Sequence, residues 1–117
     1  MGSRVLVVDD DEAIRESLRD ALSDAGYDVA VAADGRQALG MLTPRPALLL
    51  VDLMMPELDG WELLDELQRT APLADIPVCV LSAIATHAPP YAKAVLQKPV
   101  DLEHLLETIE QLTQRAP

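Results

Sequence analysis

Two runs of apolar residues in this chain contain no polar residue, and each is followed directly by aspartate. Val5–Val8 precedes Asp9 and Asp10, and Leu48–Val51 precedes Asp52. Because polar residues do not alternate within them, these runs predict strands buried on both faces, which is typical of a parallel sheet. Ligands of such sheets bind at the carboxyl ends of the strands. We therefore expect the three carboxylates to converge if the two strands are parallel neighbours.

Strand and helix patterns alternate along the rest of the chain. Residues 27–32, 76–81 and 94–97 predict further strands, and the segments between them carry apolar residues at helical spacing. Right-handed crossovers between such elements imply an α/β fold with a doubly wound parallel sheet that helices cover on both faces. The residues expected to cap helices are Asp11 with Glu12, Asp34, Asp59 and Asp101, and the residues expected to end the first two helices are Gly26 and Thr43-Pro44.

Composition bounds the size and the partners of the chain. With 117 residues, half of them apolar, it is expected to form one domain around a single core. The formal net charge of −11 argues against nucleic acid and against an anionic membrane surface as partners, since both attract Lys and Arg. We expect residues 4–114 to be the domain, residues 1–3 a native start or a tag remnant, and residues 115–117 a tail.

Cysteine usage and hydropathy favour a cytoplasmic protein. Cys79 is the single cysteine, so a disulfide within the chain is excluded, and its place between Val78 and Val80 indicates a buried thiol. The sequence shows neither a leader pattern nor an apolar run of transmembrane length. We therefore expect no membrane insertion.

Two more polar side chains follow predicted strands. Ser82 follows residues 76–81, and Lys98 follows residues 94–97. With the three aspartates, the strand ends then offer carboxylates, a hydroxyl and an ammonium group. Three carboxylates can crowd together only around positive charge, and Mg²⁺ suits an all-oxygen site. The set as a whole suits a phosphoryl group placed on a carboxylate beside a metal.

Four short motifs occur one after another along the chain. They are Val7-Val8-Asp9-Asp10, residues 51–60, Leu81-Ser82-Ala83 and Lys98-Pro99. Each is weak alone, but together they make the chain resemble the receiver domain of two-component response regulators over residues 4–114. The resemblance implies a five-stranded, flavodoxin-like sheet of order 2-1-3-4-5, for which response regulators are themselves a known example.

The resemblance also implies a metal site and a phosphorylation site. Mg²⁺ would be bound directly by Asp10, Asp52 and the backbone carbonyl of Met54, whereas Asp9 would act mostly through a coordinated water. Asp52 would accept the phosphoryl group, since carboxylates form acyl phosphates.

Lys98 and Ser82 would bind the transferred group. The Lys98 ammonium would pair with one phosphoryl oxygen, and the Ser82 hydroxyl would hydrogen-bond another. The implied donor is a phosphohistidine on a histidine kinase or a histidine phosphotransfer protein. A homodimer or a downstream effector would be the further partner.

Each of these residues also has an ordinary structural explanation. Acids after a strand often cap the next helix, and alone Asp52 could be a loop acid, Ser82 a polar strand end and Lys98 a surface cation. Four motifs in register outweigh these explanations. Pro99 would in addition end the strand, and the family often has a cis bond at this point.

Two features, Val95 and the segment before Lys98, depart from the family pattern, and two further positions bear on how long the phosphoryl group lasts. Val95 stands where the family commonly has an aromatic switch residue, so that half of the switch does not carry over. The segment 82–98 is shorter than is typical of the family and contains Pro89-Pro90, which breaks a helix. We therefore expect a fourth helix that is short or missing. Met54 and Ile84 are apolar where the family tunes attack by water on the acyl phosphate, which predicts slow self-dephosphorylation.

Three functions compete at this point. The leading one is a phosphorylatable signalling switch that acts on itself and turns over no separate substrate, and is therefore not an enzyme in the usual sense. A phosphorylation-independent interaction module is favoured by Val95 and by the short segment before Lys98. A phosphatase with an aspartate nucleophile ranks last, because such enzymes usually have a second acid where Met54 stands.

Overall fold

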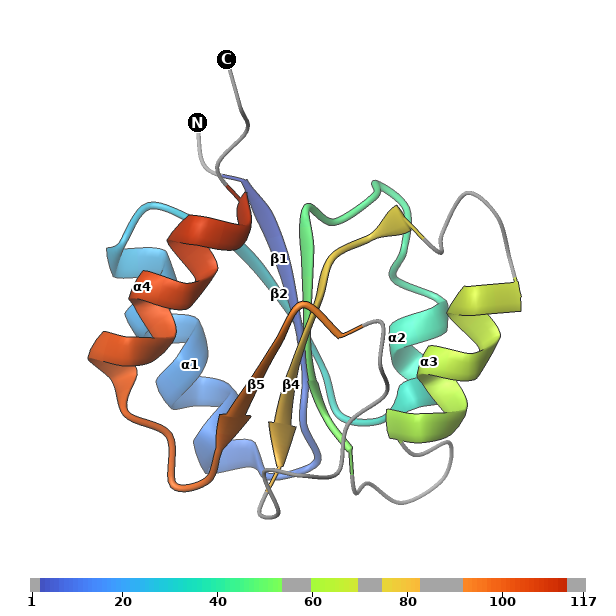
Figure 1. Ribbon diagram of the computed structural model, residues 1–117, viewed down its shortest axis with the longest axis horizontal. Coiled ribbons are helices and arrows are strands. Elements are labelled where there is room, and N and C mark those ends of the chain that lie inside the picture. Colours follow the sequence, from blue (N-terminus) through green and yellow to red (C-terminus); the bar gives the residue numbers. More distant parts are fainter. Residues whose placement is uncertain (1–2, 54–59, 70–74, 83–91, 114–117) are drawn as a thin grey trace.

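The sheet has the parallel arrangement predicted from the sequence. The computed structural model describes residues 3–53, 60–69, 75–82 and 92–113. Its five strands are parallel and lie in the order β2-β1-β3-β4-β5 (Figure 1), which confirms the doubly wound, flavodoxin-like topology. The strands are β1 (Arg4–Val8), β2 (Asp28–Ala32), β3 (Leu48–Asp52), β4 (Val78–Ser82) and β5 (Ala94–Gln97).

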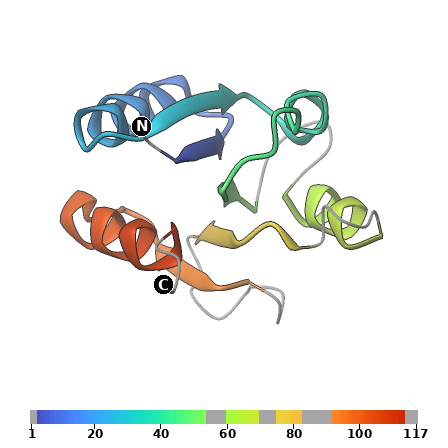
Figure 2. The ribbon, with the colours of Figure 1, turned by 90° about the horizontal axis from the view of Figure 1, so that it is seen from above.

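Helices cover both faces of this sheet. Helices α1 (Glu12–Asp24) and α4 (Leu102–Thr113) lie on one face, and α2 (Gly35–Leu39) and α3 (Gly60–Arg69) lie on the other (Figures 1 and 2). The short or missing fourth helix was predicted between β4 and β5, where residues 83–91 lie outside the described residues. No helix in the described ranges has the length and apolar character needed to cross a membrane.

Consecutive residues of β1 point into two different cores. Leu6 and Val8 pack on the side of α2 and α3, whereas Val5 and Val7 pack on the side of α1 and α4. All four side chains are fully buried. Both faces of the central strands are therefore covered, which explains why polar residues do not alternate in them. Each buried side chain of this size contributes about 1.5–3 kcal/mol through removal from water, so burial of the central strands stabilises the fold.

Helix starts follow the predicted capping pattern. In each of three helices an aspartate oxygen accepts a hydrogen bond from a backbone N–H that the first helical turn leaves free. The bonds join Asp11 to Ala13 at 2.9 Å, Asp34 to Gln37 at 2.8 Å and Asp101 to Glu103 at 3.0 Å. The predicted cap of α3, Asp59, lies outside the described residues.

The second helix is shorter than predicted. It ends at Leu39, whereas the sequence pattern extended it to Thr43-Pro44. The N–H groups of Gly40 and Met41 each bond a carbonyl three residues back, at 3.1 and 2.9 Å, so the chain tightens and leaves the α-helix. Glycine favours this because it is a poor helix former. Leu42 is nevertheless buried, as its place in the pattern predicted.

The fourth strand begins later than predicted. It starts at Val78 instead of Ile76, because Pro77 has no N–H with which to join the ladder. The carbonyl of Pro77 still accepts a hydrogen bond from the N–H of Leu49 at 2.9 Å.

Candidate functional site

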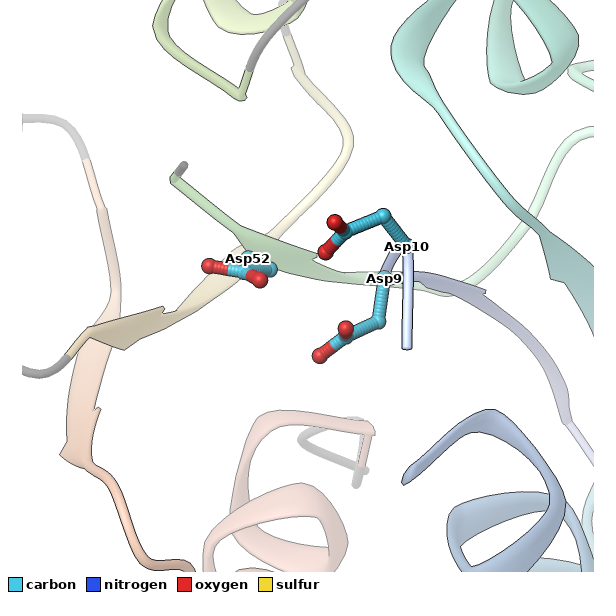
Figure 3. A group of neighbouring side chains, drawn as sticks. All are labelled: Asp9, Asp10 and Asp52. Atoms are coloured by element: carbon cyan, nitrogen blue, oxygen red, sulfur yellow. The ribbon is translucent and has the colours of Figure 1, made fainter. Parts of the chain in front are cut away.

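Strand register brings the three aspartates together. Val8 of β1 lies opposite Val51 of β3, so Asp9 and Asp52 come next on neighbouring parallel strands. Asp10 is one residue further along the chain. Each of the three carboxylates offers an oxygen within 4.8 Å of the others, and Figure 3 shows Asp9 and Asp10 directed toward Asp52. The predicted convergence is thus observed in the structure.

Asp9 is held on several sides and is completely buried. Its backbone N–H donates to the carbonyl of Ala32 in β2 at 3.1 Å, and its Oδ1 accepts from the N–H of Asp11 at 2.9 Å. Its other oxygen, Oδ2, has no hydrogen-bond partner among the described residues. Burial raises the pKa of Asp9, and the charge of Asp52 adds to this, although the Asp11 N–H and Lys98 act in the opposite direction.

Lys98 joins the acids from the end of β5. Its Nζ donates to Asp52 Oδ2 at 2.9 Å and lies 3.4 Å from Asp9 Oδ2, which is an ion pair without the geometry of a hydrogen bond. Burial alone would lower the pKa of Lys98, but the hydrogen bond to Asp52 and the charges of both acids outweigh it and raise the pKa. Lys98 is therefore a cation shared between two carboxylates. The Lys98-Pro99 peptide is cis, as the resemblance implied.

Ser82 lies at the same edge of the sheet. It is the last residue of β4 and is buried, and Leu81 before it lies opposite Asp52. The backbone N–H of Lys98 donates to the Ser82 carbonyl at 2.9 Å, which fixes the two strand ends side by side. Ser82, which carries the hydroxyl, is therefore one residue beyond the position in β4 that lies opposite Asp52.

The positions predicted to tune the switch are only partly described. Val95 in β5 is half-buried and packs against the core on the side of α2 and α3. Met54 and Ile84 lie outside the described residues. The Met54 carbonyl therefore stays a prediction as a metal ligand.

One residue of the site was missed by the sequence reasoning. The Arg15 guanidinium in α1 donates from Nη1 to the backbone carbonyl of Asp9 at 2.9 Å. A signal was present, since Arg15 comes one turn after the capping residue Asp11 and helical side chains lean toward the N-terminus of their helix. Its side chain is thereby directed back to the end of β1.

The site can bind a metal ion. Its three carboxylates provide hard oxygen ligands, and Asp9 Oδ2 is a buried acceptor that receives no hydrogen bond from the part of the chain that the structure describes. Lys98 neutralises only part of the charge of the cluster. The donor set therefore fits a divalent cation.

Comparison with known proteins identifies the class. Residues 5–110 match the response regulator receiver domain family, and the chain belongs to this family of two-component signalling proteins. It is a receiver domain and not a conventional enzyme, and its acidic triad is consistent with a phospho-accepting site.

Among curated proteins, the chain is similar to the response regulator MprA. It is 43% identical over 122 residues to MprA of Mycolicibacterium vanbaalenii, covering 98% of this chain and 52% of that protein. It is 44% identical over 119 residues to MprA of Mycobacterium avium, covering 96% and 51%. The chain thus spans about half the length of the curated relatives it matches.

Among solved structures, two receiver folds illustrate the likeness. Chemotaxis protein CheY4 of Vibrio cholerae superposes with a TM-score of 0.84 at 31% identity, covering 96% of this chain and 99% of that one. The receiver domain of a histidine kinase from Syntrophus aciditrophicus gives 0.86 at 27% identity, covering 99% and 96%. Family membership implies a histidine kinase as the general class of partner.

Proposed function

We propose that Asp52 accepts a phosphoryl group from a partner phosphohistidine and that the added charge shifts the domain between two conformations. The observation that carries this proposal is the convergence of Asp9, Asp10, Asp52 and Lys98 at one edge of the sheet. The donor is a histidine kinase or a histidine phosphotransfer protein, and the readout is altered binding to a second copy or to a downstream effector. The domain comprises residues 4–114 and acts in the cytoplasm.

The cofactor in this proposal is Mg²⁺. Asp9, Asp10 and Asp52 would hold it together with the backbone carbonyl of Met54. When bound, it neutralises negative charge on the transferring group. Asp9 Oδ2 supports the assignment, because it is buried and receives no hydrogen bond from the described residues, its one neighbouring charge there being Lys98 at 3.4 Å.

Each side chain of the site has its own role in the transfer of the phosphoryl group. A carboxylate oxygen of Asp52 forms the new O–P bond while the P–N bond of the donor breaks. The electron pair of that bond stays on the imidazole nitrogen, and a donor protonated at its other nitrogen leaves as neutral imidazole. Lys98, now bound to Asp52 Oδ2, then pairs with a phosphoryl oxygen. The Ser82 hydroxyl hydrogen-bonds another.

Phosphorylation of Asp52 is testable with a small donor. We expect phosphoramidate and Mg²⁺ to add the mass of one phosphoryl group to the parent chain and to Asp65→Asn, an exposed acid of α3, but none to Asp52→Asn. Intact-mass spectrometry measures this. Equal phosphorylation of Asp52→Asn would contradict the assignment.

A second candidate function is an interaction module that does not use phosphorylation. Val95 favours it, because a valine in β5 has no ring to change its position. A parent chain that binds Mg²⁺ but gains no phosphoryl group from any donor would favour this module over the switch.

Slow loss of the phosphoryl group is a further expectation. Met54 and Ile84 cannot orient an attacking water by hydrogen bonding. We expect the double variant Met54→Asn, Ile84→Glu to lose its phosphoryl group at least about tenfold faster, since a positioned acid or base contributes on the order of 10²–10⁴. Decay is followed by intact mass after removal of the donor, with Met54→Leu, Ile84→Val as the apolar control. A double variant no faster than the parent would refute the tuning role.

A further inference from the structure

Arg15 connects the first helix to the end of the first strand. It is half-buried in α1, and its Nη1 donates to the Asp9 carbonyl at 2.9 Å, across six residues of sequence. Pairing of β1 with β3 ends at Val8 and Val51, so this carbonyl lies just beyond that ladder. The guanidinium thus binds the main chain where the two acidic residues begin.

Three hydrogen bonds lie beside Asp10, of which one begins the helix after it and two span it. The backbone N–H of Arg15 donates to the Asp11 carbonyl at 3.0 Å, and the N–H of Asp11 donates to Asp9 Oδ1 at 2.9 Å. The third is the bond from the Arg15 guanidinium to the Asp9 carbonyl. Asp10 itself is exposed, and the two hydrogen bonds that span it are made by Asp9, Asp11 and Arg15. Of the three bonds, only the one from the guanidinium can be removed without changing Asp9 or the backbone.

We propose that Arg15 is a positioning residue, which fixes the Asp9-Asp10 peptide so that both carboxylates face Asp52 and the cation they hold. This rests on the metal site of the proposed function and adds to it a residue that touches neither metal nor phosphoryl group. Groups that orient metal ligands commonly change affinity about 10–100-fold when they are removed.

The charge of Arg15 and its hydrogen bond to the Asp9 carbonyl should have opposite effects on the affinity of the site for a cation. Loss of a positive charge near three carboxylates would tighten Mg²⁺ binding by electrostatics alone. Loss of the hydrogen bond to the Asp9 carbonyl would weaken it, because the turn that carries Asp10 gains freedom. The sign of the change therefore distinguishes positioning from charge.

The test measures Mg²⁺ affinity by calorimetry in the whole chain. We expect Arg15→Met to weaken binding on the order of tenfold, and Arg15→Lys, which keeps a donor, to recover part of it. The matched control is Arg19→Met, one turn further along α1, where the side chain pairs with Glu16 on the surface. Binding in Arg15→Met that equals or exceeds the parent, or an equal loss in Arg19→Met, would overturn the proposal.

A second readout needs neither metal nor phosphate. In metal-free protein we expect the Asp11 N–H, which is bonded to Asp9 Oδ1, to exchange with solvent faster in Arg15→Met than in the parent or Arg19→Met, as followed by NMR. Unchanged exchange would overturn the proposal even if Asp52 is phosphorylated normally. Faster exchange in a chain that no donor phosphorylates would support Arg15 while the proposed function fails. If Arg15→Met does not fold, Arg15→Lys gives the same comparison with a smaller expected change.

Discussion

Replacing Lys98 with methionine is expected to destabilise the metal-free domain by about 2–3 kcal/mol, because it removes the cation shared by two buried acids. Lys98 lies 2.9 Å from Asp52 Oδ2 and 3.4 Å from Asp9 Oδ2, and its side chain is 24% exposed. Without it, the remaining carboxylates repel one another. Urea unfolding in the presence of a chelator measures the loss.

The same substitution should act oppositely on metal and on phosphate. Mg²⁺ should bind more tightly, since Lys98 no longer competes for the carboxylates, and should restore most of the stability. Phosphorylation by phosphoramidate should fall to background, because the variant has no ammonium group to pair with a phosphoryl oxygen. Lys93→Met is the control, an exposed lysine just before β5. A Lys98→Met chain as stable as Lys93→Met without metal would contradict this role.

The pH dependence of the stability follows from the raised pKa of Lys98. Its pKa is raised above 10.5 in the folded chain, so the folded state binds the proton more tightly than the unfolded state. The stabilisation is therefore complete below pH 10.5 and is lost as pH rises through the raised value. In Lys98→Met this alkaline loss should be smaller than in Lys93→Met.

Replacing Asp9 with asparagine is expected to stabilise the metal-free domain at neutral pH, on the order of 1 kcal/mol. Asp9 is fully buried, and burial raises its pKa above 3.8. A raised pKa means that ionisation of Asp9 weakens the folded state. The amide keeps an oxygen for the Asp11 N–H and removes the buried charge.

The advantage of Asp9→Asn should depend on pH in one direction. Below pH 3.8 both side chains are neutral and the difference from the parent should nearly vanish. It should grow as pH rises through the raised pKa of Asp9. Asp20→Asn, an exposed acid of α1, should show no such trend. Saturating Mg²⁺ should reverse the order, because the parent gains binding free energy that the variant lacks. Urea unfolding across pH tests both points.

Much of the fold was predictable because local and long-range signals agree. Runs such as Val5–Val8 and Leu48–Val51 lie in strands covered on both faces, and Asp11, Asp34 and Asp101 cap helices as expected. Element ends were less predictable. The end of α2 depended on tight bonds at Gly40, which hydrophobic spacing does not encode.

The acids of the site were predictable for a geometric reason. Parallel strands end at one edge, so Asp9 and Asp52 had to lie close once β1 and β3 were neighbours. Two features depend on tertiary contacts, which the spacing of residues along the sequence does not reveal. One is the pairing of Lys98 with both Asp9 and Asp52, and the other is the hydrogen bond from Arg15 to the Asp9 carbonyl.

The most direct test joins cation binding to phosphorylation in one titration. On the same samples, Mg²⁺ binding is measured by calorimetry and the initial rate of phosphorylation by phosphoramidate is measured by intact mass. If the three carboxylates form the cation site that prepares Asp52, both curves should have the same midpoint, and both should move to higher Mg²⁺ in Asp10→Asn. Phosphorylation of Asp52 at full rate without Mg²⁺, or a midpoint unrelated to binding, would contradict a single site at the ends of β1 and β3.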